Sequence, residues 1–461
     1  MGPEWVAVLA LVALFVAGTA LPINMGALAY VAAWLVGMYS LGLDEKEILA
    51  GVSGDLILTL IGVTYLFAVA RNNGTVDLIV NSAVRAVGGR VALIPWVMFG
   101  VTALLTAIGA ASPAACAIIG PIALGFAGRY GINPLMMGMF VVHGAQGGGF
   151  SPISIYGTIT NSVMEEADLP SSELTVFLAS LAVNTVMAVI LFLLFGRDLL
   201  RRRVAPAGAA PTTATATADD PLATVRSTAA GRTRSRTLAH TDTDTDTDTG
   251  TGSAGTDDTG SRREQILTLV AFLAVAVVAL AFDKNIGFVA ITAAVILTAL
   301  SPTRNRNAVR QIAWPTVLLV AGVSTYATVL TEAGSPEFVG NWAAGLGTAV
   351  LGALVLCYVG GVVSAFASST ALLPVIIPIG VPLVVNGGVD AAMFVAALAI
   401  SSTIVDVSPF STNGALILAN RPESIAEPVF YRQILVYSVI VVLIGPLLVW
   451  AALVLPGWGP S

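Results

Sequence analysis

Matched interruptions within long apolar runs constrain this chain most. Small or hydroxyl-bearing residues break the apolar sequence near Gly109–Pro113 and Gly147–Pro152, and again near Phe366–Thr370 and Asp406–Pro409. An offset of 257 pairs Ser112, Pro121, Ser151, Pro152, Ser154 and Gly157 with Ser369, Pro378, Ser408, Pro409, Ser411 and Gly414. Ser-Pro-x-Ser-x-x-Gly therefore occurs once in each half, which indicates an internal duplication.

The apolar content assigns the chain to the membrane. Of the 461 residues 56% are hydrophobic and 10% are charged, far below the roughly 25% charged content of soluble domains. A spanning helix needs about 20 apolar residues, and such runs fill most of the sequence. We therefore predict an all-α polytopic membrane protein whose first span, Trp5 to Ala20, is retained, because no basic segment or cleavage site marks a signal peptide.

The apolar runs follow the same order in each half. Five spans and one re-entrant hairpin are expected in residues 1–197, and the same set in residues 264–461. An odd number of crossings turns the second copy upside down relative to the first. The sequence thus predicts two inverted repeats with helices broken at the membrane midplane, a plan used by many secondary transporters.

Residues 198–263 lie between the two repeats. Near the start of this segment lie Arg201, Arg202 and Arg203, a Thr-Asp run follows at 241–248, and the segment contains almost no large apolar residue. It has too little apolar surface to form a core and is predicted to be a disordered linker. The alternative is a regulatory or anionic-lipid contact through the three arginines.

The positive-inside rule gives the orientation. With the linker in the cytoplasm, every arginine is cytoplasmic and only Lys46 and Lys284 lie outside. We expect a multi-pass protein of the inner (cytoplasmic) membrane with both termini external. The formal net charge of -6 identifies no partner, and no nucleic-acid partner is expected. Cys116 and Cys357 both lie in apolar segments and are expected to be small core residues.

The paired breaks carry the most informative chemistry. A helix that begins at mid-membrane presents free N–H groups to an anion, whereas unwound carbonyls and hydroxyls suit a hard cation such as sodium. Small residues in membrane helices also serve close packing, which is the alternative for any single hydroxyl. The substrate-binding candidates at the breaks are Ser112, Ser151, Ser154, Ser369, Thr370, Ser408, Ser411, Thr412 and Asn413. The predicted sodium-site residues are Ala111, Ser112, Gly149, Ser368, Thr370 and Asp406.

Two ionisable residues lie within apolar runs, His143 and Asp406. An ionisable group in a span is costly, so each is a functional hypothesis. Asp406 is a candidate for binding sodium or a proton, and His143 for binding a substrate carboxylate or titrating. The alternative for both is a residue satisfied by a neighbouring carbonyl. Neither is matched in the other repeat, where Ile400 takes the place of His143 and Gly149 takes the place of Asp406.

The first half resembles a known family. The residues that carry the resemblance include Leu21–Gly26, Gly62–Ala68, Asn72–Asp77, Ala107–Ala115 and Val142–Gln146. They closely resemble the N-terminal domain of MatC-type dicarboxylate (malonate) carriers, which belong with the divalent anion:sodium symporters of the ion transporter superfamily. The second half resembles the same superfamily more loosely, through Ser368–Ala371 and the run from Pro374 to Pro378.

The resemblance implies a homodimer and elevator-like movement of a hairpin-bearing domain during dicarboxylate uptake. The symporters carry Ser-Asn-Thr at both hairpin tips, whereas this chain has Ala111-Ser112-Pro113 and Ser368-Ser369-Thr370. The roles of Ser112, Ser369 and Thr370 transfer most directly. Because both asparagines are replaced, neither the family's sodium stoichiometry nor its four-carbon preference follows for this chain.

These observations predict a secondary active transporter, not an enzyme. The expected substrate is a small dicarboxylate, malonate or a four-carbon acid, with sodium or protons as coupling ions and no other cofactor. The alternative is an exchanger or a carrier for another substrate, such as an inorganic oxyanion, or a cation antiporter on the same fold. A membrane enzyme would need a catalytic set, and one Asp with one His does not supply it.

Overall fold

The computed structural model describes residues 2–86, 90–170, 172–201, 257–282, 284–344, 348–365, 368–387, 389–422 and 425–457, and these contain helices and no extended strand. The first half contains α1 (Pro3–Ala20), α2 (Met25–Val36) with η1 (Gly37–Leu41), α3 (Glu45–Ala50), α4 (Gly54–Asn72), α5 (Thr75–Ala86), α6 (Leu93–Ala107), α7 (Ser112–Tyr130), α8 (Pro134–Gly148), α9 (Ile155–Glu166), α10 (Glu173–Phe195) and η2 (Arg197–Arg201).

The second half repeats this order from α11 onward. It contains α11 (Asp257–Phe282), α12 (Ile286–Leu300), η3 (Ala308–Gln311), α13 (Trp314–Glu332), α14 (Ser335–Ala344), α15 (Ala349–Ser364), α16 (Ser369–Gly387), α17 (Ala391–Ile404), α18 (Thr412–Ala419) and α19 (Glu427–Leu453). Five of the described helices, α4, α7, α10, α13 and α19, are long and apolar enough to cross a membrane. The prediction of an all-α polytopic membrane protein is confirmed.

The predicted linker lies mostly outside the described residues, which stop at Arg201 and resume at Asp257. The sequence analysis did not identify α14, which links α13 to α15 as α5 links α4 to α6. Cys116 and Cys357 are buried and free, as expected.

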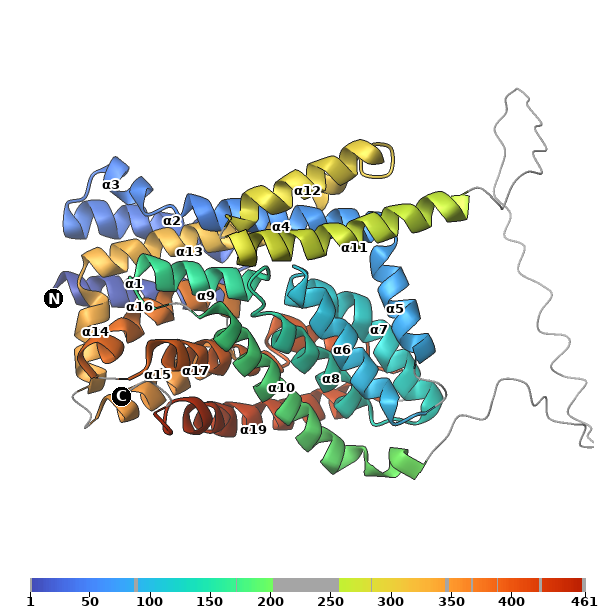
Figure 1. The fold of residues 1–461 in the computed structure, drawn as a ribbon. Helices are drawn as coiled ribbons and strands as arrows, with labels where there is room; N and C mark the ends of the chain where they lie inside the picture. The colour runs from blue at the N-terminus through green and yellow to red at the C-terminus, as the bar shows by residue number, and fades with distance from the viewer. Residues whose placement is uncertain are drawn as a thin grey trace, which may run out of the picture.

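The helices form two layers (Figure 1). One layer contains α1, α2, α4, α11, α12 and α13, and the other contains the hairpins α6–α7 and α15–α16 with α8, α10, α17 and α19. Across the layers, α13 contacts α16, and α9, which packs on α16 of the hairpin layer, contacts α4. Contacts between the halves are matched: α4 packs on α12 as α13 packs on α2, and α7 packs on α18 as α16 packs on α9. The repeat order is therefore visible in the packing, while the inversion of the copies stays a prediction.

Glycines allow the two central crossings of the first layer. Gly26 of α2 lies so close to α13 that a Cβ on Gly322 would stand 2.0 Å from the Gly26 carbonyl oxygen. At the matched crossing, a Cβ on Gly62 of α4 would stand 2.6 Å from the carbonyl oxygen of Gly287 in α12. Small residues at such crossings let membrane helices approach at backbone distance.

Substitution of Gly322 tests this crossing. Gly322→Ala is expected to destabilise the protein by about 1–3 kcal/mol or more, because the added methyl group meets backbone that has no room to move. The measurement is the thermal unfolding midpoint of the purified protein in detergent. Gly100→Ala is the control, because nothing lies within 4 Å of a Cβ at Gly100. Equal midpoints for the two variants would contradict the proposed packing.

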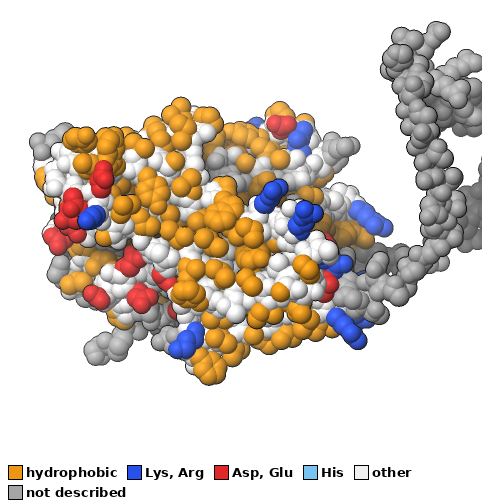
Figure 2. Space-filling model, turned by 90° about the horizontal axis from the view of Figure 1, so that it is seen from above, with side chains coloured by type: hydrophobic (Ala, Val, Ile, Leu, Met, Phe, Trp, Pro, Cys, Tyr) orange, Lys and Arg blue, Asp and Glu red, His pale blue; other side chains and the backbone are white. Residues whose placement is uncertain are grey.

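The charged side chains separate toward the two ends of the molecule. Figure 2 shows that most of the visible Lys and Arg side chains lie at one end and most of the Asp and Glu side chains at the other, with an apolar surface between them. Exposed leucines, valines and isoleucines occur on α10, α12 and α19. A protein that spans a bilayer is expected to have this distribution.

Candidate functional site

The two Ser-Pro-x-Ser-x-x-Gly segments have the same local structure. Ser154 precedes α9 and Ser411 precedes α18, and each accepts a hydrogen bond from the backbone N–H three residues later. The Ser411 hydroxyl donates to the carbonyls of Asp406 and Ser408, both at 2.7 Å. The Ser154 hydroxyl likewise donates to the carbonyls of Gly149 and Ser151. Each serine thus satisfies one of the N–H groups that a helix start leaves free and carbonyls of the turn before it.

Glycine closes each of these turns. A Cβ on Gly157 would stand 2.0 Å from the carbonyl oxygen of Ser151, and a Cβ on Gly414 equally close to that of Ser408. No side chain fits such an approach, so the glycine of the motif is required by the turn. The motif therefore stops one helix and starts the next within a single turn of backbone.

The hairpin tips are matched in the same way. Ser112 begins α7 and donates to the carbonyl of Ala145 at 3.4 Å, and Ser369 begins α16 and donates to the carbonyl of Ser402 at 3.2 Å. All four residues obey the offset of 257. Each tip is thus attached to the broken helix of its own half, and the serine side chain forms the attachment.

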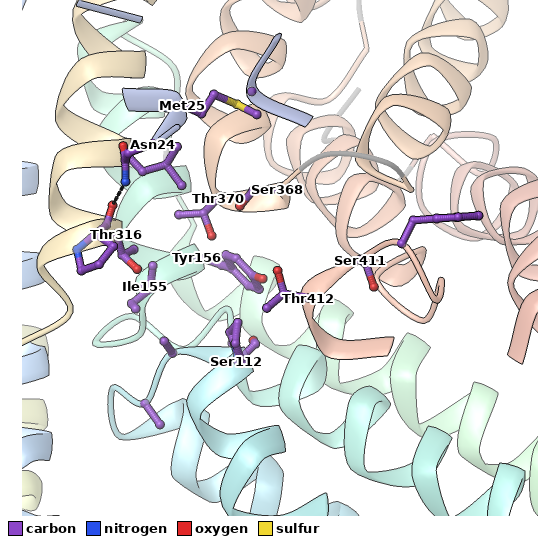
Figure 3. A pocket seen from close by; sticks show the side chains of 18 residues that line it. Asn24, Met25, Ser112, Ile155, Tyr156, Thr316, Ser368, Thr370, Ser411 and Thr412 are labelled. Atoms are coloured by element: carbon purple, nitrogen blue, oxygen red, sulfur yellow. Dashed lines mark hydrogen bonds between the residues drawn. The ribbon is translucent and has the colours of Figure 1, made fainter. Parts of the chain in front are cut away.

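A cavity of about 450 Å³ lies where these four breaks meet. The N-terminal residues of α7, α9, α16 and α18 all contribute to its wall, and the start of α13 and the turn before α2 complete it. Figure 3 shows Tyr156 between Ser112, Thr370 and Thr412, side chains that come from both halves of the chain. The lining residues are Gly18, Asn24, Met25, Ala110, Ala111, Ser112, Pro113, Gly149, Ile155, Tyr156, Pro315, Thr316, Leu319, Ser368, Thr370, Phe410, Ser411 and Thr412.

The electrostatics of this cavity come from the backbone. No Lys, Arg, Asp or Glu is among the described residues that line it. Each helix N-terminus carries about half a positive charge, and its free N–H groups donate to anions. Four such ends at one cavity favour a small anion, and no fixed positive side chain is needed.

The predicted site residues divide into two groups. Lining the cavity are Ala111, Ser112, Gly149, Ser368, Thr370, Ser411 and Thr412. The predicted residues outside the lining are Ser151, Ser154, Ser369, Ser408, Asn413, His143 and Asp406. Several of the second group hold the backbone: Ser151 donates to the Ala107 carbonyl at 2.8 Å, and Ser408 accepts from the Phe410 N–H at 3.1 Å.

Asp406 lies directly behind the cavity wall. It follows α17, is 7% exposed, and its Oδ2 accepts a hydrogen bond of 3.4 Å from the hydroxyl of Tyr156, a lining residue. The Asp406 carboxylate also interacts electrostatically with Ser369, and Tyr156 with Ser112 and Thr370. A buried carboxylate is thus connected to both hairpin tips through Tyr156 and Ser369.

His143 is placed away from the cavity, in the middle of α8. Its Nδ1 lies 2.9 Å from Oδ1 of Asn184 in α10, and its Nε2 lies 2.7 Å from the hydroxyl of Tyr437 in α19. The imidazole is fully buried, and both ring nitrogens have partners. The structure therefore supplies the partners that the sequence did not identify, and they join three helices.

Replacement of His143 separates a structural role from substrate binding. His143→Leu is expected to leave Oδ1 of Asn184 and the Tyr437 hydroxyl without their partner in a buried place, while Nδ2 of Asn184 keeps its hydrogen bond to the Ser180 carbonyl, at a cost of about 2 kcal/mol or more. The thermal unfolding midpoint should fall, while KM for the transported anion stays within about twofold. A raised KM at an unchanged midpoint would instead place His143 at the substrate.

The sequence analysis missed Tyr156 and Asn24. Tyr156 lies inside the first Ser-Pro motif and is paired by the offset of 257 with Asn413, which was selected. Asn24 precedes α2, where its Oδ1 accepts from the Gly26 N–H at 2.9 Å and its Nδ2 donates to the Pro315 carbonyl at 3.0 Å. The repeat offset could have identified Tyr156, whereas Asn24 lies outside the paired breaks.

Comparison with known families assigns each half separately. Residues 1–149 match the family described as "Dicarboxylate carrier protein MatC N-terminus", and residues 284–458 match the family described as "Citrate transporter". No curated protein sequence matches the chain significantly. Both families are transporters, which confirms the predicted resemblance to a MatC-type carrier of the ion transporter superfamily and the expectation that the chain is not an enzyme.

Proposed function

We propose that this membrane carrier, related through its two halves to the MatC and citrate transporter families, transports small carboxylate dianions by cation-coupled alternating access. The observation that carries the proposal is the cavity at which four helix N-termini meet without a charged side chain in the described lining. Such a site attracts carboxylates through backbone N–H groups and hydroxyls, and it releases them without breaking an ion pair to Lys or Arg.

Malonate and the four-carbon dicarboxylates are the preferred substrates. The family matched by residues 1–149 is a dicarboxylate carrier, and the hydroxyls of Ser112, Thr370 and Thr412 lie on different sides of the cavity (Figure 3). Polar groups on separate sides of the cavity suit a molecule with a carboxylate at each end. Citrate is the second candidate, because residues 284–458 match the citrate transporter family.

Asp406 is the proposed coupling residue. Its carboxylate is shielded from solvent and joined to the cavity through Tyr156. Hard cations prefer oxygen ligands, and the carboxylate, Tyr156 and Ser369 supply oxygens at one place. Binding of a sodium ion or a proton would neutralise Asp406 and remove its repulsion of the incoming dianion, which couples the two binding events.

Asn413 supports a ligand at this place. It is fully buried, and neither its Oδ1 nor its Nδ2 has a hydrogen-bond partner among the described residues. The offset of 257 pairs Asn413 with Tyr156 and Asp406 with Gly149, and a Cβ on Gly149 would stand 2.8 Å from the Tyr156 ring. Since Tyr156 lies beside Gly149 in the first half, we expect its counterpart Asn413 to lie beside Asp406, the counterpart of Gly149, in the second half. A buried amide without partners is costly, so we assign its oxygen to the coupling cation.

Movement between the two layers is the proposed mechanism of alternating access. The connectors α5 and α14 join the layer of α4 and α13 to the hairpin layer. A second cavity of about 820 Å³ lies between α13 and α16, with Glu166 and Glu337 in its wall. The two cavities share α9, α13 and α16, so an elevator-like shift of the hairpin layer along α13 would expose the site to the opposite side.

The membrane context follows the same reasoning. We propose that the carrier acts as a homodimer in the cytoplasmic membrane, with the linker of residues 198–263 in the cytoplasm. The basic end of the molecule is then cytoplasmic, in accordance with the positive-inside rule. An exchanger, a carrier for an inorganic oxyanion and a cation antiporter are the alternatives on this fold.

Uptake by the reconstituted full-length protein tests the proposal. Proteoliposomes would receive labelled malonate, succinate, citrate or sulfate under an imposed sodium gradient, and separately under a pH gradient. We expect concentrative uptake of malonate or succinate with one of the two gradients. Uptake of citrate alone would transfer the assignment to the second family, and uptake of sulfate alone to an oxyanion carrier. Absence of uptake of all four anions would overturn the carboxylate assignment.

A further inference from the structure

An apolar groove between α10 and α19 lies outside the transport site. It has a volume of about 740 Å³ and is lined from one side by Met187, Ile190 and Leu194 of α10 and from the other by Val436, Ile440 and Ile444 of α19. Several of these side chains are open to the surroundings, with exposed fractions of 69% for Leu194 and 48% for Ile440. Because α10 and α19 are long and apolar enough to cross a membrane, we expect the groove to face the hydrocarbon of the bilayer.

The polar groups of this groove gather at one end. Arg432 and Gln433 in the second turn of α19 line it there, together with Asn133, the residue that precedes α8. Arg432 is exposed and has no ion-pair or hydrogen-bond partner among the described residues. The nearby Glu427 forms an ion pair of 3.1 Å with Arg421. The Arg432 guanidinium, unpaired among the described residues, thus lies at the polar end of the apolar groove.

The dimensions match one lipid chain. The lining extends along α19 from Pro428 to Leu448, which at 1.5 Å per residue is about 30 Å, and the part from Arg432 to Leu448 is about 24 Å. A bilayer has a hydrocarbon core of about 30 Å, so the α19 wall runs through most of its depth, while the α10 wall, Met187 to Phe195, covers about 12 Å of it at the basic end. An acyl chain can lie in the groove while its headgroup stays at the level of Arg432.

The floor of the groove is held in place. Tyr437 lines it, and its hydroxyl lies 2.7 Å from Nε2 of His143 in α8. His143 is held in turn by Asn184, so the Tyr437 ring is restrained from turning into the groove. The groove is therefore already open and does not require rearrangement to accept a chain.

We propose that the α10–α19 groove binds an anionic phospholipid, with an acyl chain between the two helices and the headgroup phosphate at Arg432. Charge complementarity selects the occupant: guanidinium binds phosphate through paired N–H donors, and the apolar walls bind the chain. One arginine facing an anionic headgroup corresponds to a preference of about fivefold over a neutral one.

Native mass spectrometry of the full-length protein in detergent tests this site. The probes are phosphatidylglycerol and phosphatidylcholine with identical acyl chains, added in equal amounts. We expect the wild-type protein to retain phosphatidylglycerol about fivefold over phosphatidylcholine, and Arg432→Gln to reduce this ratio to about one. The matched control is Arg306→Gln, which removes another exposed arginine that does not line the groove and should leave the ratio unchanged.

A second pair of variants tests the acyl-chain part of the groove. Ile440→Trp fills the groove and should abolish retention of either lipid at this site, whereas Val439→Trp should not. The two neighbours are similarly exposed, 48% and 50%, and only Ile440 lines the groove.

Three outcomes would overturn the proposal. They are an equal loss of lipid in both arginine variants, undiminished binding by Ile440→Trp, and a lipid-free dimer that Ile440→Trp dissociates. The last would assign the groove to a second copy of the chain. None of these measurements depends on transport, so their failure is distinct from failure of the carrier function.

Discussion

Asp406→Asn is expected to abolish gradient-driven uptake while it spares exchange of labelled for unlabelled substrate. The Asp406 carboxylate is 7% exposed and accepts from Tyr156 of the cavity wall. Loss of its charge should weaken cation binding by about ten- to hundredfold, because contacts to a charged group are worth about 1.5–3 kcal/mol. Exchange requires only that the substrate-loaded site moves from one side of the membrane to the other. The neutral amide of asparagine imitates the neutralised carboxylate and permits this step.

The measurement compares two assays on one proteoliposome preparation. Concentrative uptake under the driving gradient should fall at least tenfold, and counterflow should stay within about threefold of wild type. Asp390→Asn is the control at the other end of α17: Asp390 accepts from the Met393 N–H at 2.8 Å, and asparagine caps a helix equally well. Full gradient-driven uptake by Asp406→Asn would remove this residue from the coupling mechanism.

The sequence was most informative about the backbone of the site. Ser154 and Ser411 fall at equal positions of the repeat, and both hold the break by the same hydrogen bonds. This was predictable because a helix break in a membrane requires local donors and acceptors whatever the surroundings. The offset of 257 therefore placed all four helix starts that meet at the cavity.

The direction of individual side chains was not predictable in the same way. In α8 every residue from Leu135 to Gly148 is buried, so no polar face distinguishes the side toward the cavity. His143 was selected for its charge, yet α10 and α19 supply its partners. Ser369 begins α16 as expected, but its hydroxyl forms hydrogen bonds with the Ser364 hydroxyl and the Ser402 carbonyl. Packing between helices that are distant in the sequence determines these orientations. The repeat offset and the hydrophobic pattern do not predict that packing.

The anion-binding role of the helix N-termini leads to the second large expected effect, at Thr370. This residue lies in the first turn of α16 and lines the cavity. Thr370→Asp should raise KM for a dicarboxylate by at least about a hundredfold, because two like charges about 4 Å apart repel by about 4 kcal/mol near a protein surface. Folding should be preserved, since a carboxylate near a helix N-terminus is favourable. The new side chain therefore competes with the substrate for the same dipole.

Two further variants separate charge from shape. Thr370→Val removes only the hydroxyl and should raise KM by about tenfold, in accordance with the loss of one hydrogen bond to a charged group. Thr348→Asp introduces the same carboxylate at the start of α15, where Thr348 accepts from the Leu351 N–H at 3.3 Å and lies outside the cavity lining. KM should then stay at the wild-type value. If Thr370→Asp transports with unchanged KM, the four helix N-termini do not bind the anion, because a fixed carboxylate among them would repel a bound dianion and raise KM.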